Sequence, residues 1–214
     1  MKNEYVSTIR HFTNVDALYK ILEQGLKFSS GRSWSDKDDV FDIKQYSKII
    51  KKDVAVLCMC NGMGNLHHWA IIRNKRKGLN AIKCSIVFNK NDFLRYVSSL
   101  KKFEKPRKVK YCSEIDVLTC DISDIPYLKK REYDIEKEIR FIYLGCDAEK
   151  SAIIPNIVPY IKCIEISKNG CSKTDFNQIR TTIENLYPQL KGRVFQYDLS
   201  WKEKIKILIQ HKLK

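Results

Sequence analysis

Residues 5–28 read YVSTIRHFTNVDALYKILEQGLKF, and this stretch decides the fold prediction. Its first part, residues 5–13, predicts a strand. Either Thr13 or Asn14 then caps a helix, because the side-chain oxygen of each can accept a hydrogen bond from the first helical turn. The apolar face of that helix consists of Val15, Leu18, Ile21 and Leu22. Gly25 suits the left-handed position after a helix, so the chain is expected to return as a short strand.

Further periodic and apolar stretches follow, with no internal repeat and no low-complexity linker. We predict further strands over residues 53–60, 79–88, 138–144, 160–167 and 193–197, and helices over residues 40–52, 66–72, 92–101 and 174–186. Helices and strands are interleaved, and the length suits one domain. The sequence therefore predicts a single α+β domain over residues 1–214.

The composition is that of a globular protein, with 214 residues, 43% of them apolar and 30% charged. No apolar run approaches the roughly 20 residues that span a bilayer. The first residues, MKNEY, lack the apolar core of a secretion signal. We expect a cytoplasmic protein without a membrane segment.

The eight cysteines form neither a disulfide framework nor a metal motif. Cys58 and Cys60 are the only close pair, and no Cys-x-x-Cys occurs. His67 and His68 lie near this pair, but adjacent ligands on one element point apart. Reduced thiols and no metal are expected.

Positive charge dominates, with 40 Lys and Arg against 25 Asp and Glu, a net charge of +15. Such an excess favours polyanionic partners. Residues 101–110, KKFEKPRKVK, place Phe103 among six cations, and residues 73–77 add four more. Cations bind phosphates, and an aromatic ring can stack on an unpaired base, so RNA or single-stranded DNA is the preferred partner. A solvated basic face, or a surface that pairs with an acidic antitoxin, remains the alternative.

Polar residues on otherwise apolar strands are the candidates for chemistry. His11 ends the first strand, immediately before the capped helix. Glu136, Glu138 and Arg140 would share one face of an extended chain at the start of an apolar strand. Two carboxylates there are costly unless they have a partner. A salt pair with Arg140 on a solvated face is the alternative to a functional site.

Together these residues resemble the ADP-ribosyltransferase superfamily, in particular its bacterial branch that modifies DNA and RNA. Members open with a strand carrying His-x-Thr followed by a helix, as in His11-Phe12-Thr13, and close the catalytic core with Glu-x-Glu, as in Glu136-Lys137-Glu138. The resemblance covers residues 5–30 and 132–144. It implies an ADP-ribosyltransferase-like split mixed or antiparallel sheet with flanking helices. The superfamily's Ser-Thr-Ser strand is missing, and Cys58-Met59-Cys60 is a poor substitute.

The activity that the resemblance implies is NAD-dependent mono-ADP-ribosylation of nucleic acid by a toxin of toxin–antitoxin or antiviral defence systems. Glu138 would stabilise the positive charge that develops on the ribose as the bond to nicotinamide breaks. Glu136 would orient the acceptor. His11 would hold a ribose hydroxyl group.

The remaining cofactor contacts are also implied by the resemblance. Thr13 would cap the helix or touch NAD, and Arg10 and Arg32 would meet its pyrophosphate. Tyr46 or Trp69 would stack on nicotinamide, with Trp34 as a further candidate.

Two other functions stay open at this stage. The charge alone predicts a non-catalytic module that binds nucleic acid. Asp36 and Asp39, with Glu136 or Glu138, would be the ligands of a metal-dependent nuclease.

Overall fold

The computed structural model describes residues 8–30, 36–64, 66–71, 78–145 and 152–198. These residues form a mixed α+β fold around a seven-stranded sheet of order β11-β10-β4-β1-β3-β8-β5. Neighbouring strands are antiparallel except β10 and β11, which are parallel. The predicted α+β class is confirmed.

The strands of this sheet are β1 (Thr8–Asn14), β3 (Val54–Asn61), β4 (Lys83–Asn89), β5 (Arg107–Lys108), β8 (Glu138–Leu144), β10 (Ile161–Ser167) and β11 (Val194–Tyr197). Two small sheets pair β2 (Leu26–Lys27) with β9 (Ile153–Ile154), and β6 (Lys110–Cys112) with β7 (Leu128–Lys130). The α-helices are α1 (Val15–Gln24), α2 (Lys37–Ile50), α3 (Leu66–Ile71), α4 (Lys90–Ser99), α5 (Glu114–Val117) and α7 (Lys173–Leu186). Short 3-10 helices are η2 (Leu79–Ala81), η3 (Ile122–Tyr127), η4 (Arg131–Glu136), η5 (Val158–Tyr160) and η6 (Pro188–Leu190).

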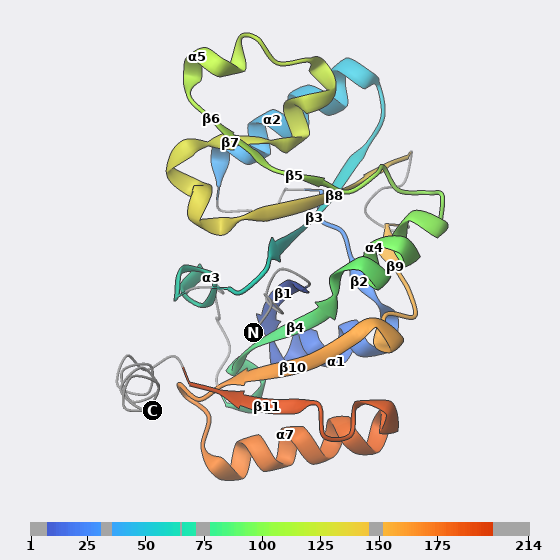
Figure 1. The fold of residues 1–214 in the computed structure, drawn as a ribbon, viewed down its shortest axis with the longest axis vertical. Helices are drawn as coiled ribbons and strands as arrows, with labels where there is room; N and C mark the ends of the chain where they lie inside the picture. Colours follow the sequence, from blue (N-terminus) through green and yellow to red (C-terminus); the bar gives the residue numbers. More distant parts are fainter. Residues whose placement is uncertain (1–7, 31–35, 65, 72–77, 146–151, 199–214) are drawn as a thin grey trace, which may run out of the picture.

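The main hydrophobic core lies between the sheet and helices α1, α4 and α7. Its members come from both layers, with Leu18 of α1, Phe93 of α4 and Ile183 of α7 packed against strand residues such as Ile86. Figure 1 shows α1 and α7 beside β10 and β11 at one end of the molecule, and α2 with the β6–β7 pair at the other end. A smaller core under α2 contains Tyr46.

The strand β1 is attached very unequally to its two neighbours. It pairs with β4 along its whole length, from Thr8 to Asn14, but with β3 only at Ile9 and Arg10. Beyond Arg10 the strands β1 and β3 therefore separate. This opening lies beside β8, because β8 pairs with the other edge of β3.

Several boundaries differ from the sequence prediction for local reasons. Helix α2 begins at Lys37 rather than at residue 40, because Asp36 is its N-cap and accepts from the backbone of Asp38 and Asp39. The strand expected over residues 79–88 begins only at Lys83, after the 3-10 turn η2. Glu136 does not extend β8, because Lys137 adopts a left-handed conformation with φ 47° and ends η4. Asn14 is confirmed as the cap of α1.

Within the part of the chain that the structure describes, no helix combines the length and the apolar character that crossing a membrane requires.

Candidate functional site

The centre of the site is a buried ion-pair cluster around Arg140 on β8. Its guanidinium is fully buried and contacts both carboxylate oxygens of Asp39, at 2.8 and 2.9 Å. It also contacts Oε2 of Glu138 at 3.0 and 3.1 Å. Burial alone would lower the pKa of Arg140, but the neighbouring negative charges, Glu138 foremost among them, raise it. Glu138 and Arg140 thus share one strand face, as the sequence predicted, but their ion pair is buried and not on a solvated face.

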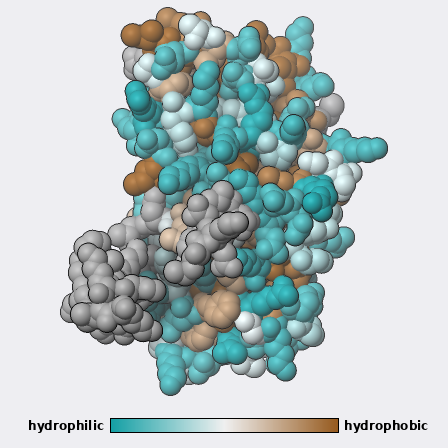
Figure 2. Space-filling model, in the orientation of Figure 1, coloured by the Kyte–Doolittle hydropathy of each residue, from teal (hydrophilic) through white to brown (hydrophobic). Residues whose placement is uncertain are grey.

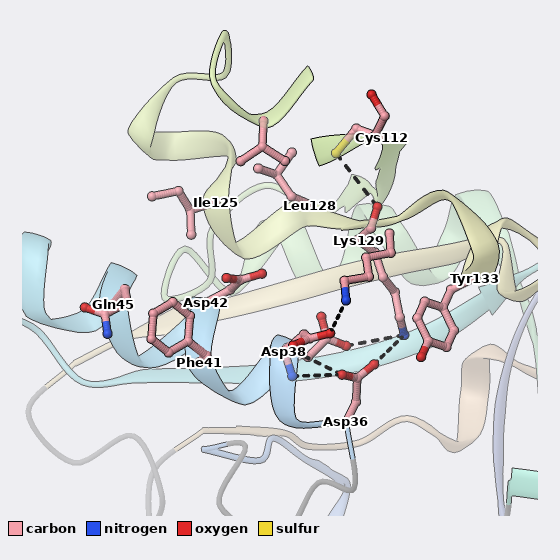
Figure 3. Close-up of a pocket in the computed structure, with 14 residues that line it drawn as sticks. Asp36, Asp38, Phe41, Asp42, Gln45, Cys112, Ile125, Leu128, Lys129 and Tyr133 are labelled. Carbon is pink, nitrogen blue, oxygen red and sulfur yellow. Dashed lines mark hydrogen bonds and ion pairs between the residues drawn. The ribbon is translucent and has the colours of Figure 1, made fainter. Parts of the chain in front are cut away.

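Lys129 on β7 is the second buried cation. Its Nζ lies 2.6 Å from Glu136, 3.3 Å from Asp39, and 3.9 Å from both Asp36 and Glu138. Figure 3 shows Lys129 meeting Asp36 across the gap between β7 and the start of α2. Burial would lower the pKa of Lys129, but Glu138 and Asp39 raise it. Four carboxylates therefore share one ammonium group.

The metal-dependent nuclease considered from the sequence requires these carboxylates to bind a metal ion. The four carboxylates proposed as ligands do converge, but around cations of the chain itself. Among the described residues, no group of three or more His, Cys, Asp or Glu is placed to hold a metal ion.

Glu136 connects the cluster to helix α3. Its Oε2 receives a hydrogen bond from Lys129, and its Oε1 lies 3.1 Å from Nε2 of His67. The backbone carbonyl of Glu136 lies 2.9 Å from Nε2 of His68. Burial lowers the pKa of His68. Both oxygens of the Glu136 carboxylate are therefore occupied.

Glu138 is held in a different way. Its backbone N–H donates to the hydroxyl of Tyr111 at 2.8 Å. Its contacts with Arg140 and Lys129 all involve the single oxygen Oε2. Within the described residues, no hydrogen bond or ion pair engages Oε1 of Glu138. One oxygen of this carboxylate is thus fixed while the other stays open for a ligand.

A cavity of about 110 Å³ lies at the opening between β1 and β3. It is lined by Arg10, His11, Phe12, Cys58, Met59, Cys60, His68, Glu136 and Glu138. The imidazole near the N-terminus and both candidate carboxylates therefore line one cavity.

His11, one of the residues that line the cavity, carries an unusual buried group. Its Nδ1 atom is buried and has no hydrogen-bond partner among the described residues. Burial lowers the pKa of His11 to about 4, although a hydrogen bond to the backbone of Cys58 raises it in part. His11 is accordingly neutral at physiological pH. A buried nitrogen without a partner is costly unless a ligand or water satisfies it.

Two other residues proposed for NAD binding lie close by but are engaged elsewhere. Arg10 lines the cavity, but its guanidinium contacts Glu165 and the carbonyl of Gly62. Thr13 is buried further along β1, opposite Cys84 of β4.

The aromatic residues predicted to stack on nicotinamide do not line this cavity. Tyr46 packs in the small core under α2. Trp69 is buried and stacks on Tyr197, with ring centroids 5.4 Å apart. Phe12 is the aromatic residue that lines the cavity, and it stacks on His68 at 4.9 Å. Arg32 and Trp34 lie outside the described residues.

Sequence reasoning missed four residues that hold the site together. In the sequence, nothing distinguishes Lys129 from the many other cations of this basic chain. Tyr111 likewise looks like an ordinary aromatic residue of a strand. His67 and His68 were considered only as metal ligands. Their adjacency did carry a signal, because one turn of helix presents His67 to the Glu136 carboxylate and His68 to its carbonyl.

The basic stretch over residues 101–110 lies largely on the surface and includes the edge strand β5. Lys101, Lys102, Lys105 and Lys108 are exposed. Phe103 is instead partly buried and stacks on Phe28, with centroids 4.9 Å apart and planes at 5°. The expectation that Phe103 stacks on a base is therefore not supported. The loop over residues 73–77 lies outside the described residues.

Comparison with models of known protein families gives no match, and comparison with curated proteins gives no significant match. What the site can do chemically therefore follows from its own geometry.

Proposed function

We propose that this chain is an ADP-ribosyltransferase that cleaves the bond between ribose and nicotinamide in NAD and transfers ADP-ribose to nucleic acid. The observation that carries the proposal is the shared cavity. Glu136, Glu138 and His11 line it together. Such convergent polar groups are typical of a binding site.

The cavity fits the sugar end of NAD better than the whole dinucleotide. At about 110 Å³ it is smaller than the roughly 300–1,000 Å³ of pockets that enclose a drug-sized ligand. Glu138 Oε1, which has no hydrogen-bond or ion-pair partner among the described residues, is the group offered to a ribose hydroxyl. His11 lines the same cavity. Arg10 is committed to Glu165, so we do not assign it to the pyrophosphate. The cavity seats the reacting ribose, and the rest of the nucleotide extends beyond it.

Glu138 has the properties that the chemistry requires. NAD supplies a glycosidic bond whose cleavage releases neutral nicotinamide and develops positive charge on the ribose. The open oxygen of Glu138 faces that charge, while Arg140 fixes the other oxygen. A carboxylate held in place before the reaction lowers the barrier because it needs no reorganisation.

His67 and Glu136 form the second functional pair. Because Nε2 of His67 lies against Glu136 Oε1, the ring's second nitrogen, Nδ1, remains to accept a proton. The side chain of His67 is 36% exposed and is not among the residues that line the cavity, so the acceptor would meet it at the surface beside the cavity. His67 would take the proton that the attacking group loses, and Glu136 would act through His67 rather than touch the acceptor itself.

The exposed lysines of residues 101–110 support a nucleic-acid acceptor. Binding that depends on them should weaken as salt increases, because phosphate contacts release counterions. Replacing both Lys105 and Lys108 by Glu should reduce RNA binding and make the affinity less sensitive to salt. Fluorescence anisotropy with single-stranded RNA and single-stranded DNA measures both effects.

Labelled NAD tests the reaction itself. The protein is incubated with NAD labelled in its adenylate part and with separate pools of RNA, single-stranded DNA and protein. We expect label on nucleic acid, and a loss of about 100-fold or more in Glu138→Gln. Glu132→Gln, an exposed carboxylate of η4, is the matched control and should leave labelling unchanged. Equal labelling by Glu138→Gln and the parent chain would exclude this function.

The two steps can be separated with His67→Ala. Release of nicotinamide should persist in this variant, because Glu138 is intact, whereas label on nucleic acid should fall. If both activities fall together, His67 serves the cleavage step instead.

We further propose that the activity serves a toxin–antitoxin or antiviral system. Expression of the parent chain in bacteria should arrest growth, and expression of Glu138→Gln at the same level should not. Arrest by both chains would exclude a toxin acting through this carboxylate.

A further inference from the structure

A second, larger cavity lies between α2 and the segment over residues 112–133. Its volume is about 380 Å³. Figure 3 shows Phe41, Ile125 and Leu128 around it, with the Asp42 carboxylate beside them. The cavity is therefore an apolar hollow with carboxylates at its edge. We call it the α2–α5 groove.

Exposed apolar side chains continue beyond the groove. Phe41 and Val117 line it and are 59% and 45% exposed. Ile115, Leu118 and Ile122 of the same segment are 78%, 87% and 55% exposed. Figure 2 shows brown residues gathered at the end of the molecule where Figure 1 places α5. Several large apolar side chains exposed in one segment are typical of a protein interface.

The charge of this region opposes that of the whole chain. The net charge is −3 over residues 36–42, −4 over residues 112–126 and +2 over residues 128–133, which together give −5. The whole chain carries +15. A polyanion is therefore repelled here, and a cationic partner is attracted.

The cations near the groove are already engaged with particular carboxylates. Lys129 contacts Asp36 and Asp39, and Lys130 contacts Asp38 at 2.7 Å. Asp42 is half-buried and has no ion pair among the described residues. Burial, together with Asp39 and Asp38, raises its pKa to about 6. Asp42 is the carboxylate of the groove with the most to gain from an incoming cation.

We propose that the α2–α5 groove docks a basic amphipathic segment of a partner protein. Aliphatic side chains of that segment fill the cavity between Phe41 and Leu128, and its Lys or Arg side chains meet Asp42. This combination is the helix-in-groove mode of recognition, in which apolar anchors give affinity and charge gives orientation. The proposal is independent of the ADP-ribosyltransferase activity.

Two short synthetic peptides test the charge complementarity. One contains Leu and Lys at helical spacing, and the other contains Leu and Glu in the same positions. Titration of the fluorescently labelled peptides into the full chain should show binding of the Lys peptide only. Equal binding of both peptides, or of neither, would overturn the proposal.

Variants then locate the binding. Asp42→Asn and Val117→Ser should each weaken the Lys peptide by about tenfold. Asp92→Asn on the exposed side of α4 is the matched control and should not change the affinity. Thermal unfolding checks that the variants fold. Unchanged affinity in both groove variants would place the peptide elsewhere and overturn the assignment.

Light scattering separates a partner from a second copy. The chain should be monomeric at concentrations where the Lys peptide binds. Self-association that Asp42→Asn abolishes would assign the groove to another copy of this chain and overturn the choice of a separate partner.

Discussion

Arg140 is a fully buried cation whose main partners, Asp39 and Glu138, are themselves nearly buried. Replacing it by Met removes the guanidinium and leaves both carboxylates without that cation. Breaking a buried pair from one side costs about 3–5 kcal/mol. We expect Arg140→Met to lower the free energy of unfolding by that amount, measured by urea denaturation.

An exposed arginine supplies the control for this prediction. Arg95 on α4 has an 81% exposed side chain, and within the described part of the chain it pairs only with Asp92. Arg95→Met should change the free energy of unfolding by less than about 0.5 kcal/mol. Equal effects of the two substitutions would contradict the cluster as a stabilising feature.

Asp42 gives a pH dependence with a definite sign. Its pKa is raised from 3.8 to about 6, mainly by burial, so the folded state binds this proton more tightly than the unfolded state. The stability contributed by its protonation is complete below pH 3.8 and is lost as the pH rises through about 6. Asp42→Asn should therefore raise the melting temperature at neutral pH and have little effect below pH 3.8. The same gain at both pH values would contradict this reasoning.

His11 shows the opposite dependence. Its pKa is lowered from 6.5 to about 4, so stability that is complete above pH 6.5 is lost as the pH falls through about 4. His11→Asn keeps a polar side chain without this titration. The variant should lose less stability than the parent chain between these two pH values, as followed by thermal unfolding. Parallel curves for the two chains would show that His11 is not buried as a neutral imidazole.

These single residues also show what the sequence could predict. A pair of Glu138 with Arg140 was one of two alternatives, because alternation along a strand places them on one face. The structure contains that pair, but it is buried and not on a solvated face. Asp39 could not be assigned to Arg140, because 101 residues separate them and only the packing of α2 against β8 brings them together.

Gly25, which follows helix α1, has a backbone conformation and surroundings that favour glycine. Gly25 has φ 101°, and a Cβ there would lie 2.2 Å from the carbonyl oxygen of Ile154. Gly25→Ala should therefore cost both backbone strain, about 1–3 kcal/mol, and a clash with β9. Gly192 also has a positive φ, 72°, but no atom of the described residues lies within 4 Å of its Cβ position.

Comparing these two glycines separates the cost of backbone strain, which both substitutions share, from the cost of the clash with β9, which only Gly25→Ala has. Gly192→Ala should be clearly less destabilising than Gly25→Ala in urea denaturation. Equal costs would mean that the close approach of β9 to Gly25 does not matter.

Elements with strong local signals were predicted well. Helix α1 ends as expected because its cap, its apolar face and its glycine agree with one another. The 3-10 helix η4 was missed because its only local cue, the left-handed Lys137, is a residue type that rarely adopts this conformation. Strand β2 pairs with β9 and not with the main sheet. Local sequence patterns do not predict this pairing, because the two strands are far apart in the sequence.

For the molecule as a whole, the strand order decides what the candidate site contains. His11 and Glu138 lie on β1 and β8, which both flank β3, so the sheet itself brings together groups that are distant in sequence. The sequence identified both residues as candidates but not the strand between them. It also could not predict the small volume of their cavity, about 110 Å³, or that Phe12 and His68 line it.

The net charge of the chain does not show how acidic and basic residues are distributed over the molecule. The excess of +15 is not spread evenly, because residues 36–42 and 112–126 are acidic while residues 101–110 are basic. The two regions are thus expected to meet different partners.

A double-mutant cycle on nicotinamide release measures most directly whether His11 and Glu138 act on one ligand. The parent chain, His11→Asn, Glu138→Gln and the double variant are compared by kcat/KM for NAD. We predict that each single variant loses activity and that the double variant loses clearly less than the product of the two single losses, because the groups share the same ribose. Single losses that multiply, or no loss in either variant, would contradict a shared site.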